Sequence, residues 1–430
     1  EMRDLLRTYE TAYLGVSLGI ALLIWALGPL IAEYWLRSNV LQPSEIIAAI
    51  RLMGAAIALQ LPAGLYIGGL MGLQKQVLTN SLQIVWGAFR GGGAVLILWL
   101  FSPTITAFFL WQLVSNAGYC FFTRLALWRV LSPERAHAHP HFQWQLIRNT
   151  WRYAAGMTGM TLVSILLTQT DKLVVSKVLS LELLGYYTLA GALGMIPIVL
   201  ANPIALAVFP RFTGMVARGD RISLAQLYHR ACELVAVAIV PAGLTVALFA
   251  GDIIRAWTGS AMAAQQAGPV TSLLVAGQLM QAITVVPYYV ALAHGNVRLN
   301  LQIGVASFIM ITPLLILLTM RHGIMGAGLS WLIMNLATTP FYMYFLHRRF
   351  LPCELRRWFL RSVARPLLAT LPCILLGRYL WPDTSSRWLT FCLVGLAWGI
   401  AVTATAATVP EVRDRLTKAT LRLLGVFHAA

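Results

Sequence analysis

The sequence predicts an all-α polytopic membrane protein. It is 59% hydrophobic and only 11% charged, whereas soluble domains carry about 25% charged residues. Its mean hydropathy is +0.74. Apolar runs of roughly 20 residues, enough to cross a bilayer, recur from one end of the chain to the other. Such continuous runs favour helices over a β-barrel, whose strands read as alternating segments of about 10 residues.

Twelve apolar runs follow one another as predicted spans: 11–36, 45–72, 78–101, 103–130, 153–178, 181–209, 226–250, 268–292, 298–319, 324–346, 359–380 and 387–409. Several of them contain proline. Membrane helices tolerate proline because neighbouring helices bond the backbone groups that it frees. The expected architecture is therefore a bundle of about twelve transmembrane helices.

Basic residues accumulate in every second loop between these spans. One set of loops holds 22 Lys and Arg residues, and the other set holds six. The richer side of a membrane protein is cytoplasmic, so both termini of this chain are predicted to lie inside. The longest inner segments, 131–152 and 210–226, are basic and are expected to be interfacial amphipathic stretches. The first is also the natural linker between two bundles.

Composition argues against several other classes of site. The net charge of +17 is assigned to the cytoplasmic loops rather than to a nucleic-acid site. The five cysteines lie far apart, unlike a disulfide framework or a zinc site. For His137, His139 and His141, a solvated loop is favoured over a transition-metal site. No GxxxxGK[ST] motif for ATP is present. We expect no metal, no cofactor and no nucleic-acid partner.

Polar residues form stripes on the predicted spans. In span 78–101, Asn80, Gln83, Gly87 and Arg90 are spaced by 3, 4 and 3 residues, which places them on one helix face. Other spans carry similar sets: Gln112, Asn116, Tyr119 and Thr123; Thr161, Ser164, Thr168 and Asp171; Gln278 and Gln281; Asn335 and Thr339. These stripes predict a hydrophilic cavity shared by two bundles. For the isolated Ser and Thr residues, interhelical hydrogen bonding is favoured instead.

Four basic residues lie within the spans: Arg51, Arg90, Arg124 and Lys172. Ionisable groups at membrane depth usually face a bundle interior or a watery cavity, and this interpretation suits Arg90 in the middle of its span. Arg51 and Arg124 lie within two turns of a span end, so snorkelling to the interface is an alternative for them. Lys172 is predicted to be an interfacial anchor.

Two carboxylates are candidates for the cavity. Asp171 ends a polar stripe and is turned about 100° away from Lys172. Glu233 lies about two turns inside span 226–250, where it either pairs with Arg230 or binds a coupling ion. Asp252 is expected to be interfacial.

Two pairs of segments echo each other at a common offset of about 220 residues. Residues 28–35 match 251–257, and residues 76–84 match 295–303. Two related bundles are a common plan of transporters, which bind substrate at the repeat interface. By this match, the first four spans correspond to spans seven to ten, and spans five and six have no counterparts before the first span.

The segment 170–212 contains an aspartate, an apolar run, Gly-Tyr and then Pro-Arg near a predicted helix end, namely Asp171, Gly185-Tyr186 and Pro210-Arg211. Supporting stretches are 65–80, 86–93 and 322–335. This pattern resembles the start of the second lobe of bacterial polysaccharide flippases of the multidrug/oligosaccharidyl-lipid/polysaccharide exporter superfamily.

This resemblance implies two six-helix lobes followed by two extra helices. The chain then divides into a partial N-terminal lobe of four helices, a basic cytoplasmic linker, a C-terminal lobe of six helices, and two additional helices with a basic tail: 1–130, 131–152, 153–349 and 350–430. The first two helices of the first lobe are missing from this pattern, and a truncated sequence is the expected cause.

The resemblance also implies a function. The expected protein is not an enzyme but a flippase that moves polyprenyl-diphosphate-linked oligosaccharide across the bacterial inner membrane by alternating access, for surface polysaccharide such as O-antigen. The expected headgroup site comprises Arg90, Arg124, Arg51, Asn80, Gln83, Gln112, Asn116, Ser164 and Thr168. Asp171 or Glu233 would carry a coupling H⁺ or Na⁺. The other expected partners are membrane lipids and polysaccharide assembly proteins.

Three alternatives remain at the level of sequence. A multidrug exporter of the same superfamily is disfavoured, because a basic cavity with few acids suits an anionic substrate. A membrane glycan polymerase or glycosyltransferase needs catalytic groups in sizeable outer loops, and the outer loops here are short. A scaffold without transport activity would fit an incomplete first lobe.

Overall fold

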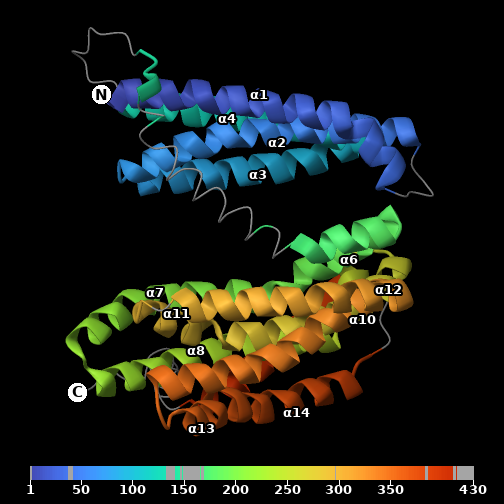
Figure 1. Cartoon of the computed structure of the whole chain (residues 1–430). Helices are drawn as coiled ribbons and strands as arrows, with labels where there is room; N and C mark the ends of the chain where they lie inside the picture. The colour runs from blue at the N-terminus through green and yellow to red at the C-terminus, as the bar shows by residue number, and fades with distance from the viewer. Residues whose placement is uncertain are drawn as a thin grey trace, which may run out of the picture. The chain divides into compact units, whose positions relative to one another are not determined.

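The structure is a computed structural model that describes residues 2–36, 42–131, 141–145, 148, 165, 169–295, 297–382, 386–409 and 413. Helices make up its regular structure, and no strand occurs among these residues (Figure 1). Ten helical stretches within them are long and apolar enough to cross a membrane. The predicted fold class, an all-α polytopic membrane protein, is confirmed.

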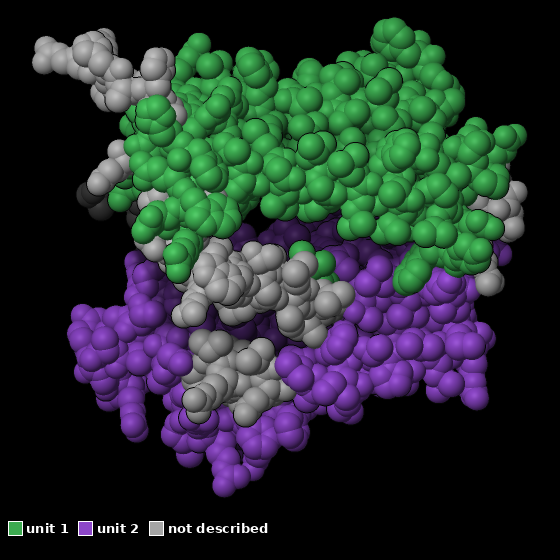
Figure 2. Space-filling model, turned by 45° about the horizontal axis from the view of Figure 1, so that its top comes forward, with its two compact units in different colours: residues 1–168 green, residues 169–430 purple. Residues whose placement is uncertain are grey.

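The chain forms two compact units, coloured separately in Figure 2. Unit 1 is Glu1–Thr168 and unit 2 is Gln169–Ala430. The expected linker 131–152 and the first half of the predicted span 153–178 lie largely outside the described residues. The same holds for His137, His139 and the basic tail.

Four long helices build unit 1, and Figure 1 shows them side by side: α1 (Met2–Tyr34), α2 (Pro43–Gly72), α3 (Gln76–Leu100) and α4 (Ile105–Val130). Helix α2 packs against both α1 and α4, and α3 packs against α4. The start of α4 is capped by Thr104, whose side chain accepts a hydrogen bond from the backbone N–H of Ala107 at 3.3 Å. Such caps satisfy the free donors of a first turn.

One glycine fixes the approach of α3 to α4. A Cβ at Gly93 would overlap the indole of Trp111, whereas Gly91 and Gly92 have open space around the Cβ position. The Trp111 indole N–H also donates to the backbone carbonyl of Arg90 at 3.0 Å. Of the three consecutive glycines, only Gly93 is therefore required by packing.

Unit 2 contains the remaining helices, named here in chain order: α6 (Leu181–Gly194), α7 (Ile196–Arg218), α8 (Arg221–Leu248), α9 (Ala250–Thr258), α10 (Ala261–Ile283), α11 (Val285–Ala293), α12 (Val297–Phe350), α13 (Leu355–Trp358), the π-helix η1 (Phe359–Ala364), α14 (Arg365–Tyr379) and α15 (Arg387–Ala407). Helix α8 is the most buried candidate span of the described chain. Its buried residues Tyr228, Val235 and Ile239 lie in the main apolar core with Phe212 and Leu346.

Some helix boundaries differ from the sequence prediction, and one is confirmed. Predicted span 181–209 divides at Met195 into α6 and α7. The segment 210–226, expected to be an interfacial stretch, is the end of α7 and the start of α8, joined by a left-handed turn at Gly219 (φ 71°). The boundary predicted between spans 298–319 and 324–346 is confirmed, because α12 is interrupted there by a sharp break at Gly323 (φ 59°, ψ −141°). Glycine reaches these conformations without the steric cost of a Cβ.

The turn before α8 ends in an N-cap. The Asp220 carboxylate accepts a hydrogen bond from the backbone N–H of Ser223 at 3.0 Å. Hydrogen bonds from the Ser223 side chain and backbone lower the pKa of the Asp220 carboxyl. The cap therefore stabilises the start of α8 above the pKa of the unfolded carboxyl, and this contribution is lost as pH falls through the folded pKa.

The last two long helices pack onto the rest of unit 2. Helices α14 and α15 contact each other and α8, and α15 also contacts α9. Two buried hydroxyls, Thr370 on α14 and Thr405 on α15, hydrogen-bond at 2.7 Å. Interhelical hydroxyl bonds of this kind are typical of membrane bundles.

Candidate functional site

The polar stripe predicted on α3 is an open face of that helix. Asn80, Gln83 and Gly87 are exposed, and Arg90 is half-buried at the end of the stripe. Apolar neighbours such as Ile84 are also exposed. Since most of α3 is exposed within the described chain, exposure alone does not distinguish this face, and its role as a cavity wall stays a prediction.

Arg90 lies against a pair of stacked aromatic rings. Its guanidinium carbon is 4.6 Å from the ring centroid of Trp86. The Trp86 indole stacks on Tyr119 of α4, with ring centroids 4.3 Å apart and an interplanar angle of 18°. Cations are attracted to the π-face of such rings, most strongly to indole. The stack joins α3 to α4 next to the Arg90 side chain.

Arg51 has a similar environment at the α1–α2 interface. Its guanidinium carbon lies 4.3 Å from the ring centroid of Trp25 on α1. The aliphatic part of its side chain lies beside Gly28, where a Cβ would be 3.7 Å from the Arg51 Cγ. The Arg51 Nε is buried and has no hydrogen-bond partner among the described residues. A buried N–H without a partner is costly and is available to an incoming acceptor.

The two arginines lie at similar depth in unit 1. With a helical rise of 1.5 Å per residue, Arg51 is about 12 Å from the start of α2 and Arg90 about 15 Å from the end of α3. The two helices are consecutive, joined by the short turn 73–75, so these helix ends lie on the same side of unit 1. Within the described residues, neither guanidinium forms an ion pair with a carboxylate. Both charges are therefore free to attract an anion.

Arg124, the third predicted headgroup cation, is neutralised by a carboxylate that the sequence analysis missed. Its Nε donates to Glu10 of α1 at 2.5 Å. Glu10 is only 1% exposed, whereas the Arg124 side chain is 45% exposed. The carboxylate also accepts hydrogen bonds from the Tyr66 hydroxyl of α2 at 2.7 Å and from Arg7 at 3.2 Å. This Glu10 cluster joins α1, α2 and α4.

The remaining predicted residues of α4 are less accessible than those of α3. Gln112 is half-buried. Asn116 is 2% exposed, and its side-chain oxygen has no hydrogen-bond partner in the described part of the chain. Their roles as substrate ligands stay predictions. Ser164 and Thr168, the ligands predicted on the next span, lie outside the described residues.

Asp171 and Lys172 have different environments, as their positions on the helix predict. The Tyr187 hydroxyl of α6 donates to Asp171 Oδ2 at 2.8 Å, and Tyr187 is almost fully buried. The other carboxylate oxygen, Oδ1, is buried and has no hydrogen-bond partner in the described structure. Lys172 is exposed and donates instead to Gln169 at 2.8 Å. One oxygen of Asp171 thus remains available to a proton or a cation.

Glu233 belongs to a polar region between α8 and the segment after α12. Its Oε1 lies 3.7 Å from Arg361 of η1, a contact that the sequence analysis did not predict. The neighbouring His229 lies 2.6 Å from Glu354, and the Tyr228 hydroxyl lies 3.1 Å from His347. These contacts connect α8 to the end of α12 and to the segment that precedes α14, which contains Glu354 and η1.

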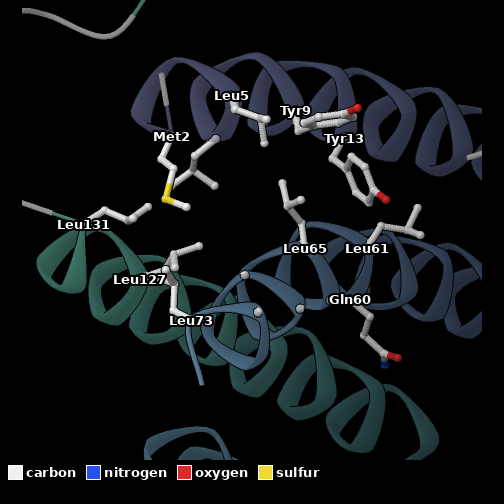
Figure 3. Close-up of a pocket in the computed structure, with 15 residues that line it drawn as sticks. Met2, Leu5, Tyr9, Tyr13, Gln60, Leu61, Leu65, Leu73, Leu127 and Leu131 are labelled. Carbon is white, nitrogen blue, oxygen red and sulfur yellow. The ribbon is translucent and has the colours of Figure 1, made fainter. Parts of the chain in front are cut away.

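An apolar groove of about 670 Å³ lies on unit 1 between α1, α2 and α4. Figure 3 shows Leu5 and Tyr9 of α1 across from Leu65 of α2, with Leu127 of α4 below. On α2, Gly64 and Gly68 have open space at the Cβ position, so the absent side chains keep the groove open. Its lining suits hydrocarbon rather than a charged headgroup.

No group of three His, Cys, Asp or Glu side chains with metal-site geometry occurs in the described ranges. What the arrangement does offer is unpaired guanidinium charge beside aromatic rings and amides. A guanidinium binds phosphate oxygens through paired charge-assisted hydrogen bonds. Exposed Asn and Gln side chains both donate and accept hydrogen bonds, as recognition of hydroxyl-rich molecules requires.

Comparison with known proteins adds independent observations. The profile of a family described as polysaccharide biosynthesis protein matches residues 4–266. A provisionally named O-antigen transporter of Shigella flexneri is 21% identical over 197 residues, which cover 45% of this chain and 45% of that protein. The amylovoran biosynthesis protein AmsL of Erwinia amylovora is 24% identical over 245 residues, or 55% of this chain and 61% of that protein.

Two further similarities extend over most of the chain. The lipopolysaccharide biosynthesis protein WzxC of Escherichia coli K12 is 21% identical over 372 residues, which cover 85% of this chain and 71% of that protein. The structure of the lipid II flippase MurJ in an inward closed conformation matches with a TM-score of 0.74 and 12% identity, over 96% of this chain and 85% of that one. At this identity, the structural match bears on the fold.

Proposed function

Because the chain belongs to the family of polysaccharide biosynthesis proteins, we propose that it is a flippase for a polyprenyl-diphosphate-linked oligosaccharide. It would act in a bacterial inner membrane, with both termini of this chain cytoplasmic, and move the lipid-linked sugar to the outer leaflet. Relatives named for O-antigen transport and lipopolysaccharide biosynthesis support this substrate class. The protein would transport its substrate without chemical change and would not be an enzyme.

The observation that carries the proposal is the pair of unneutralised guanidiniums, Arg51 and Arg90, within apolar helices of unit 1. A diphosphate headgroup carries negative charge that an apolar environment does not stabilise. Arginines at this depth supply the missing charge and form paired hydrogen bonds with phosphate oxygens. Arg124 contributes less in this proposal, because Glu10 already occupies its Nε.

The sugars would meet the open face of α3. Asn80 and Gln83 offer amide donors and acceptors there, and the stacked rings of Trp86 and Tyr119 lie next to Arg90. The polyprenyl tail would stay in apolar surroundings such as the groove of Figure 3. The proposal thus assigns headgroup, sugar and tail to chemically matched surfaces.

Asp171 is the coupling carboxylate of this proposal. Its free Oδ1 supports binding of H⁺ or Na⁺, and Glu233 is the second candidate. Other polysaccharide assembly proteins would supply the substrate and consume it.

The multidrug exporter remains the second candidate function. Unpaired arginines repel organic cations, so they favour an anionic substrate. A glycan polymerase or glycosyltransferase is disfavoured by the predicted short outer loops and by the relatives named for transport.

Complementation tests the headgroup role. Arg90→Ala, expressed in a strain that lacks its own oligosaccharide flippase and makes a matching substrate, should lose surface polysaccharide while its membrane level stays normal. Arg90→Lys should retain part of the activity, since it keeps the charge but not the paired hydrogen bonds. Arg129→Ala, at the exposed end of α4, is the matched control and should behave as wild type. Full activity of Arg90→Ala would remove the headgroup role.

A further inference from the structure

A second apolar groove lies entirely within unit 2, beside the end of α12. It has a volume of about 800 Å³, within the usual range of ligand sites. Its walls come from α8, α10, α12, α13, η1 and α14, with large apolar side chains such as Leu279, Leu336 and Phe359. Among the described lining residues, Arg356 carries the only charge.

Small residues and a π-helical segment line this groove. Gly243 of α8 is one of them, and a Cβ there would be only 3.1 Å from the Leu279 side chain, so glycine permits a close contact between α8 and α10 beside the groove. Ala276 of α10 lines the groove as well. The wall also includes η1, a π-helical segment, and such rare segments are frequent at functional sites.

Of the three arginines at or near the groove, Arg356 is the one without a carboxylate partner among the described residues. Arg357 lies 3.8 Å from Glu354, and Arg361 lies 3.7 Å from Glu233. Arg356 is exposed and has no carboxylate partner among the described residues. The local acids are thus engaged by the two neighbouring arginines, and Arg356 is left available for an anion at the groove.

We propose that this groove binds an anionic phospholipid of the surrounding membrane, with its acyl chains along the apolar walls and its phosphate on Arg356. Basic pockets between transmembrane helices bind anionic lipid headgroups in this way. A phosphodiester carries one negative charge, which one guanidinium matches through paired hydrogen bonds. The bound lipid would join α8, α10 and α12 to η1 and α14.

The chemistry of the groove selects a phospholipid over the proposed transport substrate. A diphosphate with attached sugars needs several cations and many polar partners, whereas the side chains of the lining offer one guanidinium, the hydroxyl of Thr339 and the indole N–H of Trp358. The lipid site is separate from Arg51 and Arg90 of unit 1, so its failure would leave the proposed transport function untouched.

Native mass spectrometry of the purified full chain tests the proposal. Phosphatidylglycerol and phosphatidylcholine with identical acyl chains are titrated separately. Phosphatidylglycerol should bind about tenfold more tightly, and Arg356→Ala should abolish this preference because the charge-assisted bonds are lost. Arg348→Ala is the matched control, since Arg348 is an exposed arginine outside the groove that contacts Tyr344. It should retain the tenfold preference.

A second measurement does not depend on any variant. Phosphatidylglycerol with a photoreactive acyl chain should label peptides that contain Leu336, Met280 or Phe359, all in the groove lining. Equal binding of both phospholipids to the wild type, a preference that survives Arg356→Ala, or labelling elsewhere on unit 2 would each overturn the proposal. The proposal would also be overturned if polyprenyl phosphate displaced the photoreactive lipid at lower concentrations than unlabelled phosphatidylglycerol. That result would assign the groove to the tail of the transport substrate.

Discussion

Individual charged residues in this protein fall into two groups that have different uses. Glu10 and Arg124 satisfy each other within unit 1, so their first role is to hold helices together. Arg51 and Arg90 have aromatic rings beside them and no carboxylate partner among the residues that the structure describes, so their charges remain available. The difference depends on partners that are distant in the chain, since Glu10 and Arg124 are 114 positions apart.

Glu10→Ala should destabilise unit 1. It leaves the Tyr66 hydroxyl and the Arg124 guanidinium without their acceptor, which we expect to cost about 1–3 kcal/mol for the buried donor. The measurement is thermal unfolding of the purified protein in detergent. Arg7→Ala is the control, because Arg7 is about half exposed and exposed ion pairs contribute about 0–1 kcal/mol. Equal stability of both variants would show that the cluster is not a structural link.

Asp171→Asn separates packing from ion coupling. The amide oxygen still accepts the Tyr187 hydroxyl, so the melting temperature should change by little. The carboxylate charge is lost, so transport should no longer depend on the ion gradient. Uptake assays at several pH values and Na⁺ concentrations provide the measurement, with Lys172→Ala as the neighbouring control. If the ion dependence persists in Asp171→Asn, coupling belongs to another residue, with Glu233 as the next to test.

At the scale of elements, close helix contacts depend on a few small residues. Gly93 lets the Trp111 indole lie against α3, and that indole also bonds the backbone of Arg90. The α3–α4 contact thus positions the proposed headgroup cation through packing and not through a second charge. The neighbouring Gly91 and Gly92 make no such contact, since the space around their Cβ positions is open.

Gly93→Ala should therefore destabilise the protein and lower transport. Forcing a methyl group against Trp111 costs about 1–3 kcal/mol. Gly92→Ala, one residue away with open space at its Cβ, should be neutral or stabilising by up to about 1 kcal/mol, because alanine favours a helix over glycine. Thermal unfolding of the two variants, measured side by side, checks this. Similar destabilisation in both would mean that α3 tolerates no alanine in this turn and that the Trp111 contact is not the cause.

At the scale of the whole molecule, much of the organisation could be predicted from sequence. Continuous apolar runs depend on local pattern, and they predicted the fold class correctly. The polar face of α3 and the orientation inferred from the asymmetry of charge stay predictions. Helix breaks were harder to place. Met195 interrupts apolar sequence that reads as one continuous span, whereas the break at Gly323 lies where the sequence predicts a turn.

The rest of the candidate site depends on tertiary contacts that no local pattern encodes. His229 meets Glu354 across 125 residues, and Trp86 meets Tyr119 across two helices. Glu10 was overlooked because α1 begins at Met2, well before the predicted start of the first span. A polar residue in the first turns of such a helix becomes buried only when α2 and α4 pack against it.

The most direct test of the central claim measures movement of the substrate itself. The full chain is reconstituted in liposomes with a fluorescent polyprenyl-diphosphate-linked oligosaccharide, and its transfer between leaflets is followed by quenching from outside. We predict that the wild type and Arg129→Ala move the lipid at equal rates, and that Arg90→Ala is slower by about 10–100-fold, as loss of a charge-assisted bond to phosphate implies. A wild-type protein that leaves the lipid in place, or an Arg90→Ala variant that moves it as fast as wild type, would contradict the account.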